Sequence, residues 1–163
     1  MAELTVHTVL GWALSIESNG EAFYREAASK AQDRDVRLLF EDLAQQEQRH
    51  RRTFERMLER LPAPEEAASA DAMMEYEAYL RTALSNALFA GPESGLALAR
   101  QAADEAAALR AAIAFEKDTL LFYYDLHDLV PEAQRPALTA IVQEESAHVR
   151  QLAQVLRSGP WVS

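Results

Sequence analysis

The sequence contains no cysteine, and its 163 residues include only five glycines and six prolines. The lack of cysteine excludes disulfides, thiolate metal ligands, iron–sulfur clusters and a cysteine nucleophile. Any bound metal must therefore be held by oxygen and nitrogen atoms. Most glycines and prolines lie between the periodic segments, so little interrupts helix formation by the abundant Ala, Leu, Glu, Gln and Arg residues.

The chain also lacks a long apolar run and an excess of basic residues. No apolar segment approaches the roughly 20 residues that cross a bilayer, and the N-terminus lacks the basic-then-apolar order of a signal peptide. We therefore expect a cytoplasmic protein. The formal net charge of −10 disfavours nucleic acid and anionic membranes as partners, because both require clustered cationic contacts.

Apolar residues recur at three- and four-residue spacing, which predicts an all-α protein. We expect five helices, over residues 4–31, 35–61, 70–89, 94–129 and 132–156, or six if the fourth breaks near Ala103. The length suits one domain over residues 1–163. Short turns at 32–35 and 128–131 predict two antiparallel helix pairs. Together these pairs form a four-helix bundle, with an additional connecting helix between the two pairs.

A pattern of glutamate and histidine occurs twice in the chain. Glu17 precedes Glu47-Gln-Arg-His50 by 30 residues, and Glu116 precedes Glu145-Ser-Ala-His148 by 29 residues. Residues three apart share a helix face, so each Glu-x-x-His directs a carboxylate and an imidazole to one point. The chain travels about as far along one helix as it returns along the next, which places the glutamates level with one another.

All of these ligand candidates occupy apolar stripes, where leucine or isoleucine is expected. Burying four carboxylates is very unfavourable unless positive charge compensates for them. No lysine or arginine lies at the same level of the stripes, whereas two divalent cations would balance four carboxylates. The sequence therefore predicts a dinuclear metal site. Its predicted ligands are Glu17, Glu47, His50, Glu116, Glu145 and His148.

Other polar residues near the pattern receive different predictions. Glu21 flanks the stripe beside the site, whereas Glu144 is expected to face solvent. His127 lies near the predicted end of the bundle, where a surface or capping role is expected. Tyr24 and Tyr123 each follow a ligand glutamate by seven residues, and we expect buried aromatic rings whose hydroxyl groups need partners.

The chain resembles the ferritin-like, rubrerythrin-related proteins. The segment 16–24, followed by Glu47-x-x-His50, is similar to their first half, and 115–123 with Glu145-x-x-His148 is similar to their second half. Residues 78–89 resemble their connecting helix. The resemblance implies a ferritin-like fold that holds two iron ions, with manganese or zinc as substitutes. It implies that Glu17 and Glu116 are terminal ligands, that Glu47 and Glu145 are bridging ligands, and that His50 and His148 supply one imidazole per iron.

Two departures from the rubrerythrin pattern affect the expected chemistry. Rubrerythrins carry a further glutamate three residues before the ligand of the third bundle helix, and this chain has Ile113 there. They also carry a cysteine-ligated rubredoxin domain, which a chain without cysteine cannot form. An external electron donor is therefore expected.

The resemblance and the ligand set predict an oxidoreductase of ferroxidase or peroxidase type, acting in iron handling or oxidant defence. Its oxidant would be dioxygen or hydrogen peroxide. A non-catalytic iron buffer, a metal-dependent sensor and an interaction module are the alternatives. No sequence feature identifies an organic-substrate pocket, which disfavours hydroxylation. We expect a homodimer, with its contacts among Met73, Tyr76 and Tyr79 of the third helix, rather than a storage cage.

Overall fold

The computed structural model describes residues 5–63, 70–83 and 93–162, and these residues form helices without any strand. The long helices are α1 (Val6–Lys30), α2 (Arg34–Glu59), α5 (Glu105–Leu129) and α6 (Arg135–Ser158). The shorter elements are α3 (Ala70–Ala83), α4 (Ser94–Gln101) and the 3-10 turn η1 (Glu132–Gln134). The all-α prediction is confirmed. None of the helices in these ranges combines the length and apolarity needed to cross a membrane.

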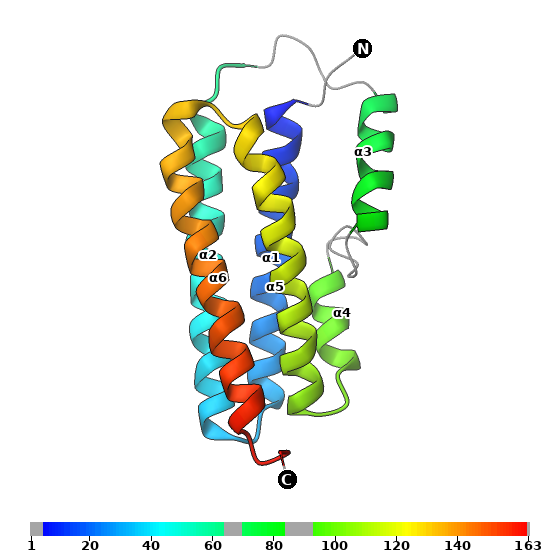
Figure 1. Cartoon of the computed structure of the whole chain (residues 1–163), viewed down its shortest axis with the longest axis vertical. Helices are drawn as coiled ribbons and strands as arrows, with labels where there is room; N and C mark the ends of the chain where they lie inside the picture. The colour runs from blue at the N-terminus through cyan, green and yellow to red at the C-terminus, as the bar shows by residue number, and fades with distance from the viewer. Residues whose placement is uncertain (1–4, 64–69, 84–92, 163) are drawn as a thin grey trace.

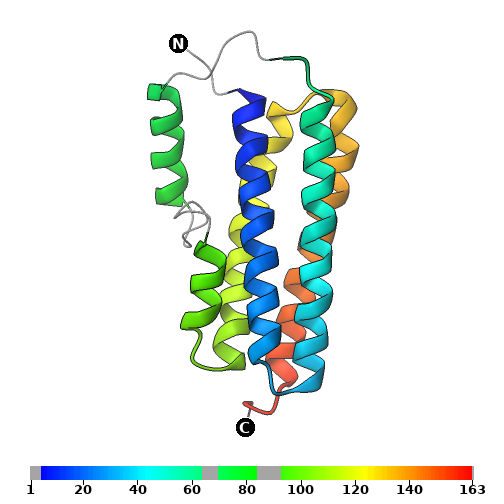
Figure 2. The same cartoon turned by 180° about the vertical axis from the view of Figure 1, so that it is seen from behind.

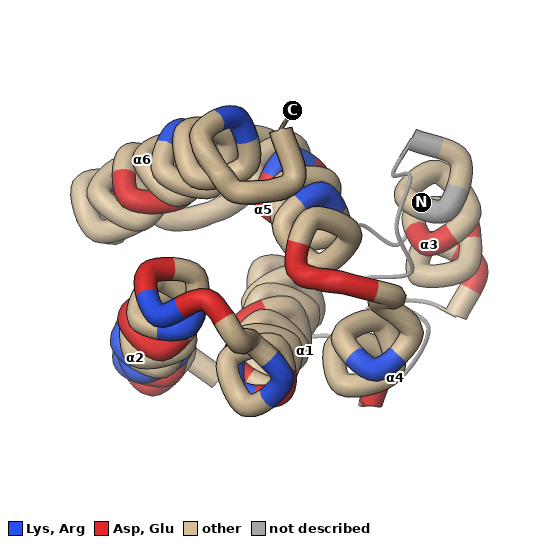
Figure 3. Tube along the Cα trace, turned by 90° about the horizontal axis from the view of Figure 1, so that it is seen from below, with Lys and Arg blue, Asp and Glu red and all other residues tan. Residues whose placement is uncertain are grey.

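The four long helices form a bundle in which α1 and α2 are antiparallel, as are α5 and α6 (Figure 1). The view from behind shows α3 and α4 along one side of the bundle (Figure 2). Seen end-on, α1, α2, α5 and α6 occupy the four corners (Figure 3). The connection between the two pairs thus contains α3 and α4, and the break near Ala103 is confirmed.

Capping side chains set the helix ends that the sequence pattern placed slightly differently. Helix α1 begins at Val6 because the Thr5 hydroxyl accepts a hydrogen bond from the Thr8 amide at 3.3 Å. Helix α2 begins one residue earlier than predicted, because Asp33 accepts hydrogen bonds from the two amides at positions 35 and 36. Each cap satisfies amides that have no partner within the helix. The predicted end of the third helix at residue 89 lies outside the described residues.

Two charged side chains form hydrogen bonds between neighbouring turns at the lower end of the bundle. The Glu105 carboxylate, in the first turn of α5, accepts hydrogen bonds from the amides of Gln32 and Asp33 at 2.6 and 2.8 Å. The Lys30 ammonium donates to the carbonyl groups at positions 99, 100 and 102, at the end of α4. These contacts join the α1–α2 turn to the α4–α5 turn and so fix the relative height of the two helix pairs.

The buried side chains form two apolar clusters at different heights. The upper cluster includes Leu10, Phe54 and Leu138. The lower cluster includes Phe40 and Leu152. Between the two clusters lies a layer of buried polar side chains, and this layer contains the candidate site.

Helix α4 packs on α1 through direct backbone contact at Gly95. The Gly95 amide donates to the Asn19 side-chain oxygen at 3.1 Å. A Cβ at this position would lie 1.9 Å from the Asn19 carbonyl oxygen, and backbone atoms cannot move aside cheaply. Only glycine therefore permits this approach.

We predict that Gly95→Ala lowers the free energy of unfolding by about 1–3 kcal/mol, which is typical of overpacking. The matched control is Gly11→Ala, because no atom lies within 4 Å of a Cβ there. The control should raise stability by about 0.5–1 kcal/mol through helix propensity. Urea denaturation measures both changes. Equal effects of the two substitutions would contradict the close contact between α4 and α1.

Candidate metal centre

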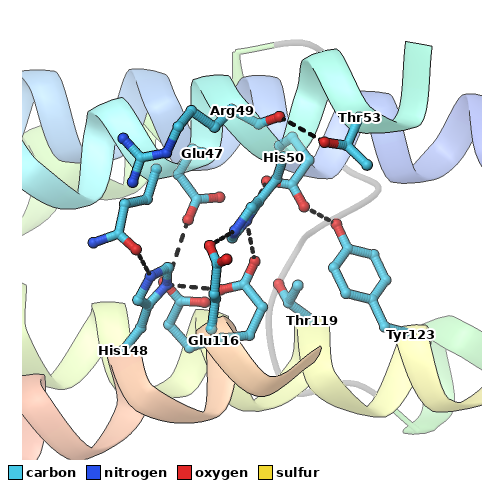
Figure 4. Close-up of polar contacts among 12 residues, drawn as sticks. Glu47, Arg49, His50, Thr53, Glu116, Thr119, Tyr123 and His148 are labelled. Atoms are coloured by element: carbon cyan, nitrogen blue, oxygen red, sulfur yellow. Dashed lines mark hydrogen bonds and ion pairs between the residues drawn. The ribbon is translucent and has the colours of Figure 1, made fainter. Parts of the chain in front are cut away.

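The structure brings all six predicted ligands together in the middle of the bundle (Figure 4). Each side chain is at most 3% exposed. They form two overlapping groups, in each of which one potential ligand atom per residue lies within 4.8 Å of the others. One group is Glu17, Glu47, His50 and Glu145, and the other is Glu47, Glu116, Glu145 and His148. Glu47 and Glu145 belong to both groups.

The two imidazole rings direct their Nδ1 atoms toward Glu145. His148 Nδ1 lies 2.8 Å from one oxygen of Glu145, and His50 Nδ1 lies 2.9 Å from the other. The carboxylates next nearest to these Nδ1 atoms are Glu116, 3.6 Å from His148 Nδ1, and Glu17, 3.5 Å from His50 Nδ1. Each imidazole therefore approaches one terminal glutamate and the shared Glu145.

The outer nitrogen of each imidazole contacts a residue of the opposite half. His50 Nε2 lies 2.8 Å from Glu144 Oε2, and His148 Nε2 lies 2.8 Å from Gln46 Oε1. The half-exposed side chain of Glu144 faces solvent as predicted, and its carboxylate in addition contacts His50. Gln46 was not predicted at all. Each residue immediately precedes a ligand glutamate, but only the packing of α2 against α6 shows which imidazole it meets.

Two buried tyrosines each contact a glutamate of the opposite half, Glu116 or Glu17. The Tyr24 hydroxyl donates to Glu116, and the Tyr123 hydroxyl donates to Glu17. Tyr24 belongs to the lower apolar cluster and Tyr123 to the upper one. The expectation that both hydroxyl groups need partners is confirmed, and the partners are carboxylates of the site itself.

The other polar residues singled out in the sequence lie outside the cluster. Glu21 forms ion pairs with Arg25 at 2.7 Å and with Arg51 at 3.5 Å. His127 lies in the last turn of α5, 3.6 Å from the carboxylate of Asp128. Neither side chain belongs to the two groups of potential ligands.

Several ligand atoms of the cluster are buried and lack any hydrogen-bond partner among the described residues. Four of them are carboxylate oxygens, from Glu17, Glu47 and Glu116. An unsatisfied buried polar atom costs about 1–3 kcal/mol. Both oxygens of Glu47 are in this state, and a Cβ at Gly20 would lie 2.5 Å from one of them. The backbone of α1 thus leaves room for the Glu47 carboxylate, and the free oxygen atoms suit a hard metal cation.

Burial sets the protonation of the glutamates in the absence of metal. It raises the pKa values of Glu17 and Glu47, and it raises that of Glu116 to about 8, with added repulsion from Glu145. Burial would also raise the pKa of Glu145, but hydrogen bonds from His148 and His50 outweigh it and lower that pKa. Glu145 is therefore the carboxylate that stays ionised.

Burial has the opposite effect on the pKa values of the two imidazoles, but the neighbouring glutamates outweigh it. Burial lowers the pKa of each ring, but contacts with Glu145 and Glu17 raise that of His50 to about 12. Contacts with Glu116 and Glu145 raise that of His148 to about 10. In the absence of metal, bound protons thus supply the positive charge that four buried carboxylates require.

The sequence profile of the rubrerythrin family matches residues 8–156. The chain belongs to the rubrerythrin family. Among solved structures, a Thermotoga maritima protein described as a ferritin-like diiron-carboxylate protein is similar, with 24% identity and a TM-score of 0.71. The match covers 97% of this chain and 98% of that chain, and it shows that the fold is a ferritin-like bundle. No curated protein matches the sequence.

In this rubrerythrin-family chain, the buried glutamate–histidine cluster is compatible with a metal site. The donor atoms are carboxylate oxygens and imidazole nitrogens, which suit iron, manganese or zinc. Ile113, at the position of the expected further glutamate, packs against the lower apolar cluster. Among the described residues, the two groups therefore contain four glutamates and no fifth.

We predict that the metal-free rubrerythrin-family protein loses stability as pH rises. The folded-state pKa of Glu116, about 8, exceeds its ordinary value of 4.5, so the folded protein keeps a proton that the unfolded chain releases between these values. The stabilisation from this proton is complete below pH 4.5 and is lost as the pH rises through about 8. The melting temperature should fall across this range, by about 3 °C for each kcal/mol lost.

The other raised pKa values, of Glu17, Glu47 and the two histidines, act in the same direction. The lowered pKa of Glu145 changes the stability of the protein only below about pH 4.5, the ordinary pKa of a glutamate. Glu116→Gln should flatten the pH dependence, because its neutral amide has no proton to lose. A melting temperature that rises with pH in the metal-free protein would contradict this charge balance.

Proposed function

We propose that the protein binds two iron ions and is an oxidoreductase of ferroxidase or peroxidase type. The observation that carries the proposal is the pair of overlapping ligand groups that share Glu47 and Glu145. Two groups with two members in common are what two neighbouring ions with bridging carboxylates require. The carboxylate oxygens without hydrogen-bond partners support the same arrangement.

The residues of the cluster take distinct roles in this proposal. Glu47 and Glu145 would bridge the ions, and Glu17 and Glu116 would each bind one ion as terminal ligands. His50 and His148 bind through Nδ1, because their Nε2 atoms already contact Glu144 and Gln46. Such outer contacts fix the orientation of a ligand imidazole and raise its basicity.

The surrounding side chains prepare the site for redox chemistry. The hydroxyl groups of Tyr24 and Tyr123 hold the terminal glutamates in place. The apolar clusters on either side of the polar layer exclude bulk water from above and below. A fixed set of oxygen ligands in a water-poor site favours the ferric state, and so favours oxidation of iron(II).

When bound, two iron(II) ions supply the two electrons that, with two protons, reduce hydrogen peroxide to two waters, or that begin the reduction of dioxygen. A peroxidase cycle then needs an external electron donor, because the chain has no cysteine for a rubredoxin-type centre. A ferroxidase cycle needs only further iron(II). The apolar packing of Ile113 favours the ferroxidase set of six ligands. A cytoplasmic location stays a prediction.

A non-catalytic iron buffer or sensor is the second candidate function. The raised pKa values of Glu116 and His148 support it, because metal ions must displace bound protons, which couples metal binding to pH. Slow or absent oxidation of bound iron(II) would favour this function over the enzyme.

The first prediction of the proposal concerns metal content. The chain loaded with iron should contain about two iron ions, because the two ligand groups have equivalent donor sets. Glu47→Ala and Glu145→Ala should each abolish dinuclear binding, since each removes a bridge. Glu144→Ala should weaken binding about 10- to 100-fold through the loss of the contact with His50.

Elemental analysis of the folded variants measures these changes. The matched control is Glu21→Ala, which removes a carboxylate of α1 that lies outside the cluster and should leave the metal content unchanged. Protein refolded with iron(II) that contains almost no metal would rule out the metal proposal.

The second prediction separates the two reactions. If the protein is a peroxidase, the anaerobic iron(II) protein should oxidise faster with hydrogen peroxide than with dioxygen. If it is a ferroxidase, dioxygen alone should sustain repeated oxidation of added iron(II). Stopped-flow absorbance measures both rates. A rate constant for hydrogen peroxide no greater than that for dioxygen would exclude the peroxidase activity. If neither oxidant oxidises the bound iron(II), the proposal that the protein is an oxidoreductase is wrong.

We also propose that the protein forms a homodimer through α3 and the adjoining face of α5. Met74 and Tyr124 are exposed by 68% and 61%, and the exposed Tyr79 hydroxyl donates to Asp125 between the two helices. Exposed apolar groups of this kind commonly mark protein contacts. Tyr76 contributes less than predicted, because it stacks on Trp12. Light scattering should give a dimer, and a cage-sized particle would contradict the proposal.

A further inference from the structure

A pocket of about 470 Å³ lies between α2 and α6, beside the candidate metal centre. Its α2 wall carries Arg49, Arg52 and Arg56. Its α6 wall carries small and apolar side chains, among them Ala140 and Ile141. The pocket therefore offers positive charge on one side and an apolar surface on the other.

The three arginines form no ion pair with any described residue. Their neighbour Arg51, in contrast, pairs with Glu21 and Glu55 on the other side of α2. Acidic residues outnumber basic ones in this chain by 26 to 16, so unpaired arginines are not a consequence of scarce partners. Arg52 and Arg56 are four residues apart, a spacing at which like charges destabilise a helix. The end-on view marks several basic positions along α2 (Figure 3).

We propose that this pocket binds a small organic anion with two or three carboxylate groups. Arg49 and Arg56 are seven residues apart, which spreads the positive charge over about 10 Å of helix. A guanidinium pairs with a carboxylate through two parallel hydrogen bonds. A chain of carbon atoms between the carboxylates fits the apolar α6 wall. A compact anion such as phosphate would reach only part of this row.

The charge of the lining matches such a ligand. The lining contains three guanidinium groups, the His50 imidazole and a single carboxylate, that of Glu144, so its formal charge is at least 3 − 1 = +2. The pocket is a partly open hollow of about 470 Å³, a volume in the range of small-molecule sites. The Glu144 carboxylate lines the pocket and should weaken anion binding by repulsion. Removing its charge should therefore strengthen anion binding.

The pocket also contacts one half of the candidate metal centre. Glu144 lines the pocket and lies 2.8 Å from His50 Nε2. An anion bound there would lie beside the carboxylate that orients His50. Gln46, which contacts the other imidazole, is not part of this lining. This link to the metal rests on the proposed function, whereas the binding of the anion does not.

Calorimetric titration of the full chain with tricarballylate, a simple tricarboxylate, tests the proposal. The wild-type protein should show saturable binding that weakens at higher ionic strength. The variant with Arg49→Gln, Arg52→Gln and Arg56→Gln should bind at least about tenfold more weakly. The control is Arg34→Gln, which removes one positive charge from α2 outside the pocket, as Arg52→Gln removes one inside it, and should bind like wild type.

Glu144→Gln gives a change in the opposite direction. It removes the negative charge and keeps an oxygen that faces His50, so tricarballylate should bind several-fold more tightly. Metal content measured before and after each titration separates binding from extraction of metal by the ligand. Binding with unchanged metal content supports the anion site even if the iron proposal fails. If the triple variant does not fold, Arg52→Gln alone should weaken binding measurably.

Four results would overturn the proposal. They are the absence of saturable binding by the wild type, equal binding by the folded triple variant, phosphate binding as tight as that of tricarballylate, and binding of polyglutamate alone.

Discussion

Four carboxylates buried at one level of a helical bundle require compensating positive charge, and the rest of the structure depends on how that charge is supplied. Without metal, bound protons supply it, because the pKa values of both imidazoles and of Glu17, Glu47 and Glu116 are raised. The apolar clusters above and below the layer fix its height. The hydrogen bonds of Glu105 at the lower turn keep the two helix pairs in register, so that the carboxylates meet.

The fold could be predicted because apolar periodicity and the two Glu-x-x-His patterns agree on where each helix faces. The structure brings together the six residues that this agreement selects, while their role as ligands stays a proposal. The contacts of Gln46 and Glu144 could not be predicted, since they depend on which helices become neighbours rather than on spacing within one helix. The approach of α4 to Asn19 could not be predicted for the same reason, although a glycine at position 95 is consistent with it.

Family membership and local structure constrain the function to different degrees. Membership of the rubrerythrin family accounts for the bundle and for a buried cluster of carboxylates and imidazoles. The proposed activity rests instead on features particular to this chain. Ile113 joins the apolar cluster and leaves a set of six candidate ligands. The sequence has no cysteine to ligate a rubredoxin-type centre.

The tyrosines of the two halves cross over, so that each secures a glutamate of the other. Reciprocal contacts of this kind are the signature of a twofold axis. A single two-helix hairpin paired with an identical copy would make the same contacts. The two halves are not identical, however, because Gln46 and Glu144 differ in charge at equivalent positions. One half of the centre thus has a neutral outer partner and the other an anionic one, so two bound ions would have unequal redox potentials.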